Sequence, residues 1–358
     1  MGFWKRQLSG PTNPATDAGW TKTESRKGFF TDTSICIGCK ACEVACKEWN
    51  HVPVRTEGRP MFGGVLSWAN QSYDNTGHLG ADTWRHVAFI EQGPEEIAKA
   101  RRSGAVDLGM PSVRGAEPAP ALAEPPDLSG AAAREPGLSS APTALADPDD
   151  TLPPVRWLMS SDVCKHCTHA GCLDVCPTGA LFRTEFGTVV VQADVCNGCG
   201  YCVGACPFGV IGRRDDGLVE LADGSRAEPV NGGVAQKCTL CYDRLKADQT
   251  PACAQTCPTT SIKFGDHDEM VRLARERLAE LHAQGRTDAR LYGANPDDGV
   301  GGTGSVFLLL DEPEVYGLPP DPIVPTAVLP KMFTMAGIAG TVLMGAVLAV
   351  FAGNGANR

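Results

Sequence analysis

Aromatic residues are scarce in this sequence: they make up 6% of its 358 residues, whereas it contains 41 glycines and 27 prolines. A chain of this length can bury a core of its own, but this composition indicates many turns and loops that something other than side-chain packing holds in place. Basic residues are outnumbered by acidic ones, and the formal net charge is −10. Because binding to nucleic acid needs a basic surface that displaces counterions, we expect no nucleic-acid partner, and zinc-ribbon transcription factors are disfavoured.

Several familiar signatures are also absent. The opening MGFWKRQLSGPTNPATDAGW has basic residues but no apolar run behind them and no twin-arginine pair, so we do not expect a secretory signal peptide. The sequence contains no Rossmann fingerprint, no P-loop and no Ser/His/Asp order that indicates a catalytic site. We therefore expect a non-catalytic chain whose export, if it is exported, depends on a partner.

Cysteine, in contrast, is abundant and strictly grouped. There are sixteen cysteines, and they fall into four groups of four with none left over. The groups are Cys36, Cys39, Cys42 and Cys46; Cys164, Cys167, Cys172 and Cys176; Cys196, Cys199, Cys202 and Cys206; and Cys238, Cys241, Cys253 and Cys257. Disulfide scaffolds are short secreted chains with a cysteine content above about 8–10%. Disulfide bonds are therefore a disfavoured interpretation of these groups.

The spacing within the groups favours iron–sulfur clusters. Thiols three residues apart on a tight loop converge on one concavity, where backbone N–H groups stabilise anionic sulfur, and Gly38, Gly198 and Gly200 permit such loops. A fourth cysteine at the start of a helix faces away and serves a second concavity, as in the CxxCxxCxxxCP run of two-cluster ferredoxins. That run occurs whole at 196–207 and with a wider gap at 164–177. Zinc, which typically takes separated CxxC pairs, is the disfavoured alternative.

Exchange of the fourth ligand between groups predicts four ligand sets, which we name sites A to D. Site A is Cys36, Cys39, Cys42 and Cys257; site B is Cys238, Cys241, Cys253 and Cys46; site C is Cys164, Cys167, Cys172 and Cys206; and site D is Cys196, Cys199, Cys202 and Cys176. Each site is expected to hold one [4Fe–4S] cluster. A simpler scheme, in which each group holds its own cluster, remains an alternative.

Histidines and basic residues lie among the cysteines. His166 and His169 are expected to be ordinary hydrogen-bonding or surface residues, because every group already supplies four sulfurs. Six basic residues flank the groups, where a positive charge could raise the potential of a cluster, although each one by itself is expected to be solvated. They are Lys40, Lys47, Lys165, Lys237, Arg213 and Arg214.

Three segments outside the groups suggest structure. Residues 61–92 have strand-forming residues on both sides of an Asn-Thr-Gly turn, which predicts a hairpin. Residues 93–153 are rich in Ala, Pro and Gly without periodicity, which predicts a surface insertion. Residues 266–285 predict an amphipathic helix that starts at Asp266 or Asp268 and ends at Gly285. Its apolar stripe consists of Val271, Ala274, Leu278 and Leu281.

The last segment predicts a membrane anchor. Residues 332–352 contain no charge, and as a helix they would be about 31 Å long, close to one hydrocarbon thickness. Thr341, Gly345 and Ala349 form a strip of small residues that suits packing against another membrane helix. Only Lys331 and Arg358 flank the segment, so charge does not set its orientation.

Taken together, these motifs resemble a known family. VCKHCTHAGCLDVCPTGAL, CNGCGYCVGACPFGV, KCTLCYDRLKADQTPACAQTCPTTSIKFG and GVGGTGSVFLLLDEPEVYGLPPDP, followed by a single membrane helix, resemble the β (iron–sulfur) subunit of membrane-bound respiratory formate dehydrogenase of the formate dehydrogenase-N type. The resemblance covers most of residues 30–352 but not the insertion near 93–153. It implies four [4Fe–4S] clusters that relay electrons.

The resemblance also implies partners. A molybdenum or tungsten bis-pterin subunit would oxidise formate, and an integral membrane cytochrome b would pass the electrons to quinone, in a heterotrimer or a higher oligomer of it. The family places the head on the outer, periplasmic-type face of the cytoplasmic membrane. The alternatives are the equivalent subunit of a nitrate, dimethyl sulfoxide or polysulfide reductase, although nitrate reductase relatives replace one cysteine with Trp and dimethyl sulfoxide reductase relatives lack the membrane helix. A zinc-bound structural tether is the rival from another class.

The expected fold class is α+β, with two pseudo-symmetric dicluster ferredoxin modules of the bacterial 2[4Fe–4S] type nested in sequence and a C-terminal transmembrane helix. The expected divisions are a docking arm at 1–30; the first half of the outer module at 31–92; the surface insertion at 93–153; the inner module at 154–215; the second half of the outer module at 216–265; a docking helix and linker at 266–330; and the anchor and tail at 331–358.

Overall fold

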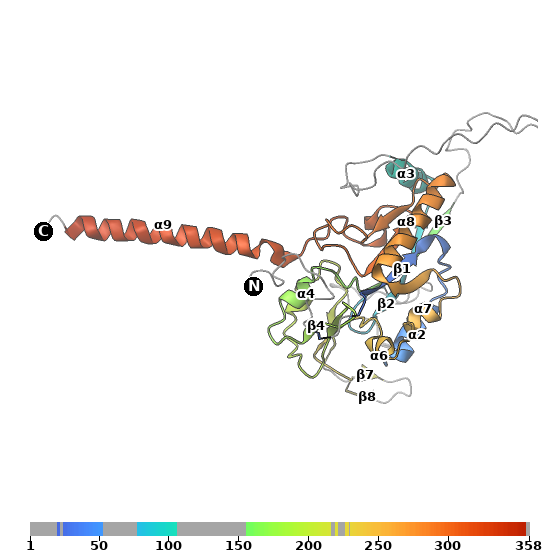
Figure 1. Cartoon of the computed structure of the whole chain (residues 1–358), viewed down its shortest axis with the longest axis horizontal. Coiled ribbons are helices and arrows are strands. Elements are labelled where there is room, and N and C mark those ends of the chain that lie inside the picture. Colours follow the sequence, from blue (N-terminus) through green and yellow to red (C-terminus); the bar gives the residue numbers. More distant parts are fainter. Residues whose placement is uncertain are drawn as a thin grey trace, which may run out of the picture.

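The structure is a computed structural model that describes residues 20–21, 24–52, 77–105, 155–215, 219–220, 226–228 and 230–355. The described chain mixes helices and strands, as the sequence predicts. It consists of a head, which contains all the cysteines, and one long helix that projects from it (Figure 1).

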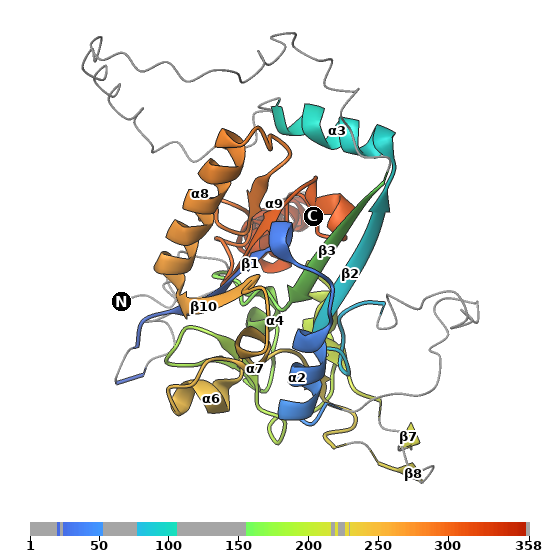
Figure 2. The ribbon, with the colours of Figure 1, turned by 90° about the vertical axis from the view of Figure 1, so that its right-hand side faces the viewer.

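A four-stranded sheet organises one part of the head. Its order is β10–β1–β12–β11, and β1 is antiparallel to β10 and parallel to β12. Figure 2 shows β1 and β10 beside α8 (His267–Ala283). The strands are β1 (Lys27–Asp32), β10 (Ile262–Asp266), β11 (Arg290–Tyr292) and β12 (Ser305–Leu309). Every residue of β12 is buried, as expected for a central strand covered on both faces. β1 begins within the range expected for the docking arm, so that range is not a separate unit throughout.

The predicted amphipathic helix is confirmed as α8 (His267–Ala283), which packs against this sheet. Val271, Ala274 and Leu281 are buried, and Leu278 packs against the core while partly exposed. Gly285 follows the helix with a φ of +78°, the conformation of a helix C-cap. Asp266 occupies the N-cap position, but its carboxylate makes no cap hydrogen bond there. It accepts instead from Lys27 Nζ on β1, at 2.6 Å.

A two-stranded ribbon crosses the head beside the sheet. It pairs β2 (Arg85–Gln92) antiparallel with β3 (Arg156–Val163). The second arm of the predicted hairpin contains β2, whose described partner β3 lies beyond the insertion; the pairing predicted within residues 61–92 stays a prediction. The first arm lies outside the described residues. The insertion is also shorter than predicted, because Pro94–Ala105 forms helix α3.

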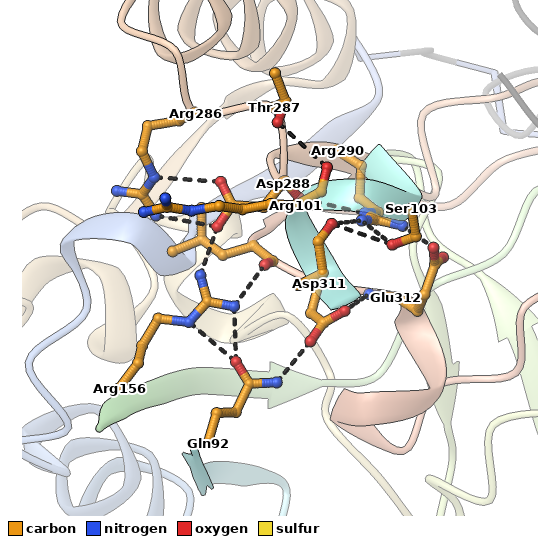
Figure 3. Close-up of polar contacts among 12 residues, drawn as sticks. Gln92, Arg101, Ser103, Arg156, Arg286, Thr287, Asp288, Arg290, Asp311 and Glu312 are labelled. Atoms are coloured by element: carbon orange, nitrogen blue, oxygen red, sulfur yellow. Dashed lines mark hydrogen bonds and ion pairs between the residues drawn. The ribbon is translucent and has the colours of Figure 1, made fainter. Parts of the chain in front are cut away.

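Polar contacts fasten the ribbon and α3 to the C-terminal loops (Figure 3). The Arg156 guanidinium donates to Gln92 Oε1, at 3.0 and 2.7 Å, and also to the buried Asp288 carboxylate. Gln92 Nε2 donates to Asp311 Oδ2 at 2.6 Å. Arg290 pairs with Glu312 and donates to Ser103 Oγ of α3 at 3.2 Å. This network holds the ribbon at a fixed position relative to the sheet.

Short elements carry or flank most of the cysteines. α2 packs against α7, and α4 packs against α5. These helices are α2 (Ala41–Trp49), α4 (Gly171–Asp174), α5 (Tyr201–Gly204), α6 (Tyr242–Lys246) and α7 (Ala252–Gln255). The small strand pairs are β4 (Leu181–Arg183) with β5 (Val189–Val191), β6 (Gly212–Arg213) with β9 (Ala235–Gln236), and β7 (Val219–Glu220) with β8 (Arg226–Ala227). The 3₁₀ helices are η2 (Thr33–Ile35), η5 (Pro313–Tyr316) and η6 (Pro325–Val328).

The head has two apolar cores of very different size. The larger one contains the sheet, α8, part of the ribbon and many aromatic and aliphatic side chains. The smaller one lies around α4 and α5. Its buried members are Ala170, Leu181, Val189, Cys202, Ile211 and Ala235. So small a core provides little apolar burial to hold its loops.

The projecting helix is α9 (Leu329–Gly355) (Figure 1). Among the described residues, one helical segment, Pro325–Ala349, is long and apolar enough to cross a membrane, and the apolar 18-residue window within it has no buried residue. Its length and composition are consistent with the predicted anchor.

Candidate metal-cluster sites

The cysteines of site A line one cavity. Cys36 follows η2, Cys39 lies on the next loop, Cys42 is on α2, and Cys257 follows α7. All four border one cavity. The rest of its wall comes from Ile37, Lys40, Val87, Ser161, Thr259, Ser261 and Ile262. A cysteine of the last group in the sequence therefore faces the first group, the arrangement that exchange of the fourth ligand requires.

The cysteines of site C line a second cavity. Cys164, Cys167 and Cys172 come from one group, and Cys206 comes from the next. The cavity is walled by the buried Lys165, His166 and Lys237 and by apolar residues that include Val189 and Ile211.

Contacts and electrostatics group the remaining eight cysteines in the same manner. The thiols that act on Cys46 include those of Cys238, Cys253 and Cys241. Asn50 joins two of these sulfurs, because its Nδ2 lies 3.7 Å from Cys46 Sγ and 3.9 Å from Cys241 Sγ. The thiols that act on Cys202 are those of Cys196, Cys176 and Cys199. These are the members of sites B and D.

The loops between the cysteines adopt left-handed backbone at the positions that turn the chain. Gly38 has a φ of +65° and Gly198 a φ of +72°. A Cβ on Gly38 would lie 2.7 Å from a ring carbon of Phe89, and one on Gly198 would lie 2.3 Å from the Gly233 carbonyl oxygen. Glycine is therefore required at both positions for the conformation and for the close approach.

Backbone N–H groups point at several of the sulfurs. Leu240 N donates to Cys238 Sγ at 3.3 Å, and Ala235 N donates to Cys196 Sγ at 3.5 Å. Burial alone would raise the pKa of Cys176, but hydrogen bonds from Leu181, from the backbone and side chain of Thr178, and from Ala180 lower it below the ordinary value. Donors of this kind stabilise a sulfur that carries negative charge.

For many of the other thiols, burial outweighs the hydrogen bonds. It raises the pKa of Cys36, Cys42 and Cys202 to about 11, and that of Cys172 to about 12. Thiols of this kind stay protonated at neutral pH unless a metal replaces the proton. All sixteen cysteines are free of disulfide bonds. The donor set of each site is four sulfurs, which fits an iron–sulfur cluster.

A single metal ion fits the arrangement less well. A zinc ion holds its sulfurs at about 2.3 Å, so its four ligands must meet closely. Within the described ranges, no three His, Cys, Asp or Glu side chains come close enough to hold one ion. The thiols stand instead around open space, which a larger group such as a cluster would fill.

Several basic residues near the cysteines are not solvated, so the expectation of solvated side chains is wrong for three of them. Lys165, Lys237 and Arg214 are 1–3% exposed. Lys165 pairs with Asp162 and Arg214 with Asp82, whereas Lys237 donates to the carbonyls of Val189 and Cys238. These contacts satisfy charges that water would otherwise solvate.

The two histidines differ in burial. His166 is 2% exposed, and its Nδ1 accepts a hydrogen bond from Val189 N at 3.2 Å, as expected for an ordinary structural histidine. His169 is partly exposed. Burial lowers the pKa of both imidazoles, so both are neutral at neutral pH.

Sequence reasoning missed one charged residue, Arg85. It begins β2, it is 1% exposed, and thiols of sites A and B surround it. A single arginine in the segment TWRHVAF has no spacing relation to any cysteine group, so the sequence carried no signal that could have identified it.

Comparisons with known proteins give this arrangement a context. A family model described as "4Fe-4S dicluster domain" matches residues 155–267. The chain is 32% identical over 330 residues to the nitrate-inducible formate dehydrogenase iron–sulfur subunit of Escherichia coli K12, which covers 90% of this chain and 82% of the relative. It is 33% identical over 340 residues to the formate dehydrogenase iron–sulfur subunit of Haemophilus influenzae, covering 94% and 81%. It is 47% identical over 107 residues to the thiosulfate reductase electron transfer subunit PhsB of Salmonella typhi, covering 30% and 48%.

Proposed function

The chain belongs to the family of formate dehydrogenase iron–sulfur subunits, and on that premise we propose that it relays electrons from a formate-oxidising catalytic subunit to an acceptor in the membrane. The single observation that carries the proposal is the gathering of sixteen free cysteines into four groups of four sulfurs.

We assign one [4Fe–4S] cluster to each of sites A to D. A bound cluster supplies a centre that accepts and releases one electron. The chain's own residues hold it through four thiolates and exclude water by the burial of the surrounding loops. The packing of α2 against α7 and of α4 against α5 supports two related modules, an outer one with sites A and B and an inner one with sites C and D.

Electrostatic interactions between thiols of different sites support a linear order of the four sites along the electron path. Three pairs of thiols from different sites act on one another electrostatically: Cys42 with Cys253, Cys238 with Cys164, and Cys172 with Cys202. These pairs join A to B, B to C, and C to D. Cys39 and Cys199 are the two exposed cysteines, and they belong to sites A and D. We infer that electrons enter and leave at these two ends.

The membrane end is assigned from the anchor. η6, which leads into α9, packs against α4, and Thr326 Oγ1 donates to Asp174 Oδ2 of α4 at 2.6 Å. α4 carries Cys172 of site C, and Cys176 of site D lies two residues after its end. We propose that site D delivers electrons to an integral cytochrome b and then to quinone. Site A would then receive them from a molybdenum or tungsten bis-pterin subunit, in a heterotrimer or a higher oligomer with its head on the outer membrane face.

Metal analysis tests the proposal against a zinc-bound tether. The native complex, purified without oxygen, should contain about sixteen iron and sixteen acid-labile sulfide per chain. It should also reduce a quinone with formate. Stoichiometric zinc with little iron would contradict the proposed function.

The rival electron-transfer assignments share the clusters and differ in the catalytic partner. The segment similar to the thiosulfate reductase subunit spans 30% of this chain, whereas the formate dehydrogenase relatives span 90% or more. Turnover of the purified complex with formate, compared with thiosulfate, nitrate, dimethyl sulfoxide and polysulfide, separates these alternatives.

A further inference from the structure

Arg85 has the largest side chain among the fully buried ones, with 1% of its surface exposed. It lies opposite Val163 in the ribbon, and its side chain shares a face with Val87, which lines the cavity of site A. Burying a charge so completely costs several kcal/mol unless other groups compensate for the lost water. The compensating groups therefore indicate what the charge is for.

The guanidinium is held in one position. Nη1 donates to the Ser161 carbonyl at 3.3 Å and to the Ser161 hydroxyl at 3.0 Å. The guanidinium carbon lies 4.9 Å from the centre of the Phe29 ring, a distance at which a cation is attracted to the ring face. These contacts fix the charge in space, but neither partner carries a negative charge that would neutralise it.

Two other buried cations of the head have acidic partners, whereas the buried Lys237 donates to backbone carbonyls. Lys165 pairs with Asp162, and Arg214 Nε lies 2.9 Å from Asp82 Oδ1. Arg85 has no carboxylate partner in the part of the chain that the structure describes. Two of its donors, Nε and Nη2, have no hydrogen-bond partner there either. Unpaired donors this deeply buried call for an acceptor.

Sulfur is what surrounds this charge. Burial alone would lower the pKa of Arg85, and the thiolates around it raise that pKa above its ordinary value. They are Cys253, Cys42, Cys238 and Cys46, of which Cys42 belongs to site A and the others to site B. Arg85 therefore lies between two sites.

Ser161 extends the effect of Arg85 to one ligand. Its Oγ lies 3.2 Å from Cys42 Sγ. Because this oxygen accepts a hydrogen bond from Arg85 Nη1, the hydroxyl hydrogen is free to point at the sulfur. Arg85 thus orients a second donor toward site A.

We propose that Arg85 is the residue that sets the reduction potentials of sites A and B together. The proposal rests on the proposed function, because it requires clusters at both sites. The fixed positive charge and the two free N–H groups stabilise the added electron at either site, and the oriented Ser161 hydroxyl stabilises it at site A alone. Since one charge serves both sites, it raises both potentials in parallel and keeps the step between them small.

The test is a redox titration of the intact complex, followed by electron paramagnetic resonance. Arg85→Gln removes the charge and should lower two of the four midpoint potentials, each by a tenfold change in the reduction equilibrium or more, which is 59 mV for a one-electron couple. Arg85→Lys keeps a positive charge but loses the planar guanidinium with its several N–H donors, so the shifts in midpoint potential should be smaller. Ser161→Ala should lower one potential, which is also one of the two that Arg85→Gln lowers.

Arg156→Gln is the matched control. It removes a second arginine of the same ribbon, which is partly buried and pairs with Asp288 away from the cysteines. It should leave all four potentials unchanged. If Arg85→Gln does not assemble, Arg85→Lys and Ser161→Ala carry the test. Four unchanged potentials in iron-replete Arg85→Gln, or in both of these variants, would overturn the proposal. So would equal shifts in Arg156→Gln. A wild-type complex without iron and sulfide would instead refute the proposed function.

Discussion

Cys36 and Cys257 face one cavity, although one lies near the start of the described chain and the other follows α7. Their proximity brings the first and the last cysteine groups together across the outer module. A cluster at site A would thus depend on a residue that no local motif around Cys36 supplies.

Replacing Cys257 tests this dependence directly. Cys257→Ser should disturb the cluster at site A, because it removes the fourth thiolate, and should spare site B, which keeps its own neighbours Cys241 and Cys253. Iron content and electron paramagnetic resonance of the purified complex measure both effects. Loss of the site B signal with site A intact would contradict the assignment and favour one cluster per sequence group.

Iron removal should affect the two cores unequally. The inner module has a small apolar core, whereas the sheet and α8 bury a large one. After chelation, we expect amides of β4 and β5 to exchange with solvent as in an unfolded segment, while those of β1 and β12 remain protected. Hydrogen exchange with mass spectrometry measures this. Equal loss of protection in both regions would mean that the sheet does not fold without clusters.

The metal-free chain should lose stability at alkaline pH. Burial raises the pKa of Cys36 and Cys42 to about 11, above the ordinary thiol value of 9.0. Between these values the unfolded chain binds fewer protons than the folded one, so the free energy of unfolding falls as pH rises from about 9 to 11. Denaturation with urea at pH 8 and pH 10 measures the fall. The Cys36→Ser, Cys42→Ser double variant should show a smaller one, and an equal fall would refute this cause.

A methyl group on Gly38 should destabilise site A. Gly38→Ala forces a side chain into left-handed backbone, at a cost of about 1–2 kcal/mol, and against the Phe89 ring. We expect a lower melting temperature and loss of iron from one site. Gly204→Ala is the control, because Gly204 is helical and a Cβ there would meet nothing within 4 Å. Equal effects of the two substitutions would show that the local geometry at Gly38 is unimportant.

Truncation tests the anchor. A chain that ends at residue 328 lacks α9, which leaves the head after η6 without packing against its cores. Produced without its partners, it should move from the membrane fraction to the soluble fraction and keep its iron content. Fractionation followed by iron analysis measures both properties. Retention of the truncated chain in membranes would assign the attachment to another surface of the head.

The sequence predicted best what depends on local spacing. The cysteine groups, α8 with its buried stripe and the apolar terminal helix all follow from short periodic patterns, and the structure contains each of them. Prediction from the sequence failed where segments that are far apart along the chain meet. The pairing of β2 with β3 joins strands on the two sides of the insertion, and no short-range pattern predicted it. The burial of Lys165 and Lys237 was missed because it depends on how the surrounding chain folds: Lys165 pairs with Asp162 of β3, and Lys237 donates to the carbonyls of Val189 and Cys238.

The order of the cysteines along the chain also has a consequence for biogenesis. A ribosome releases the chain from its amino terminus, so Cys206 emerges before Cys238. Every thiol of sites C and D is then available, whereas site A still lacks one of its thiols and site B lacks three. The inner pair can therefore be loaded on a nascent chain. On the proposed assignment, sites A and B cannot be completed until Cys253 and Cys257 have been translated. The site that receives the electrons is therefore among the last to be assembled.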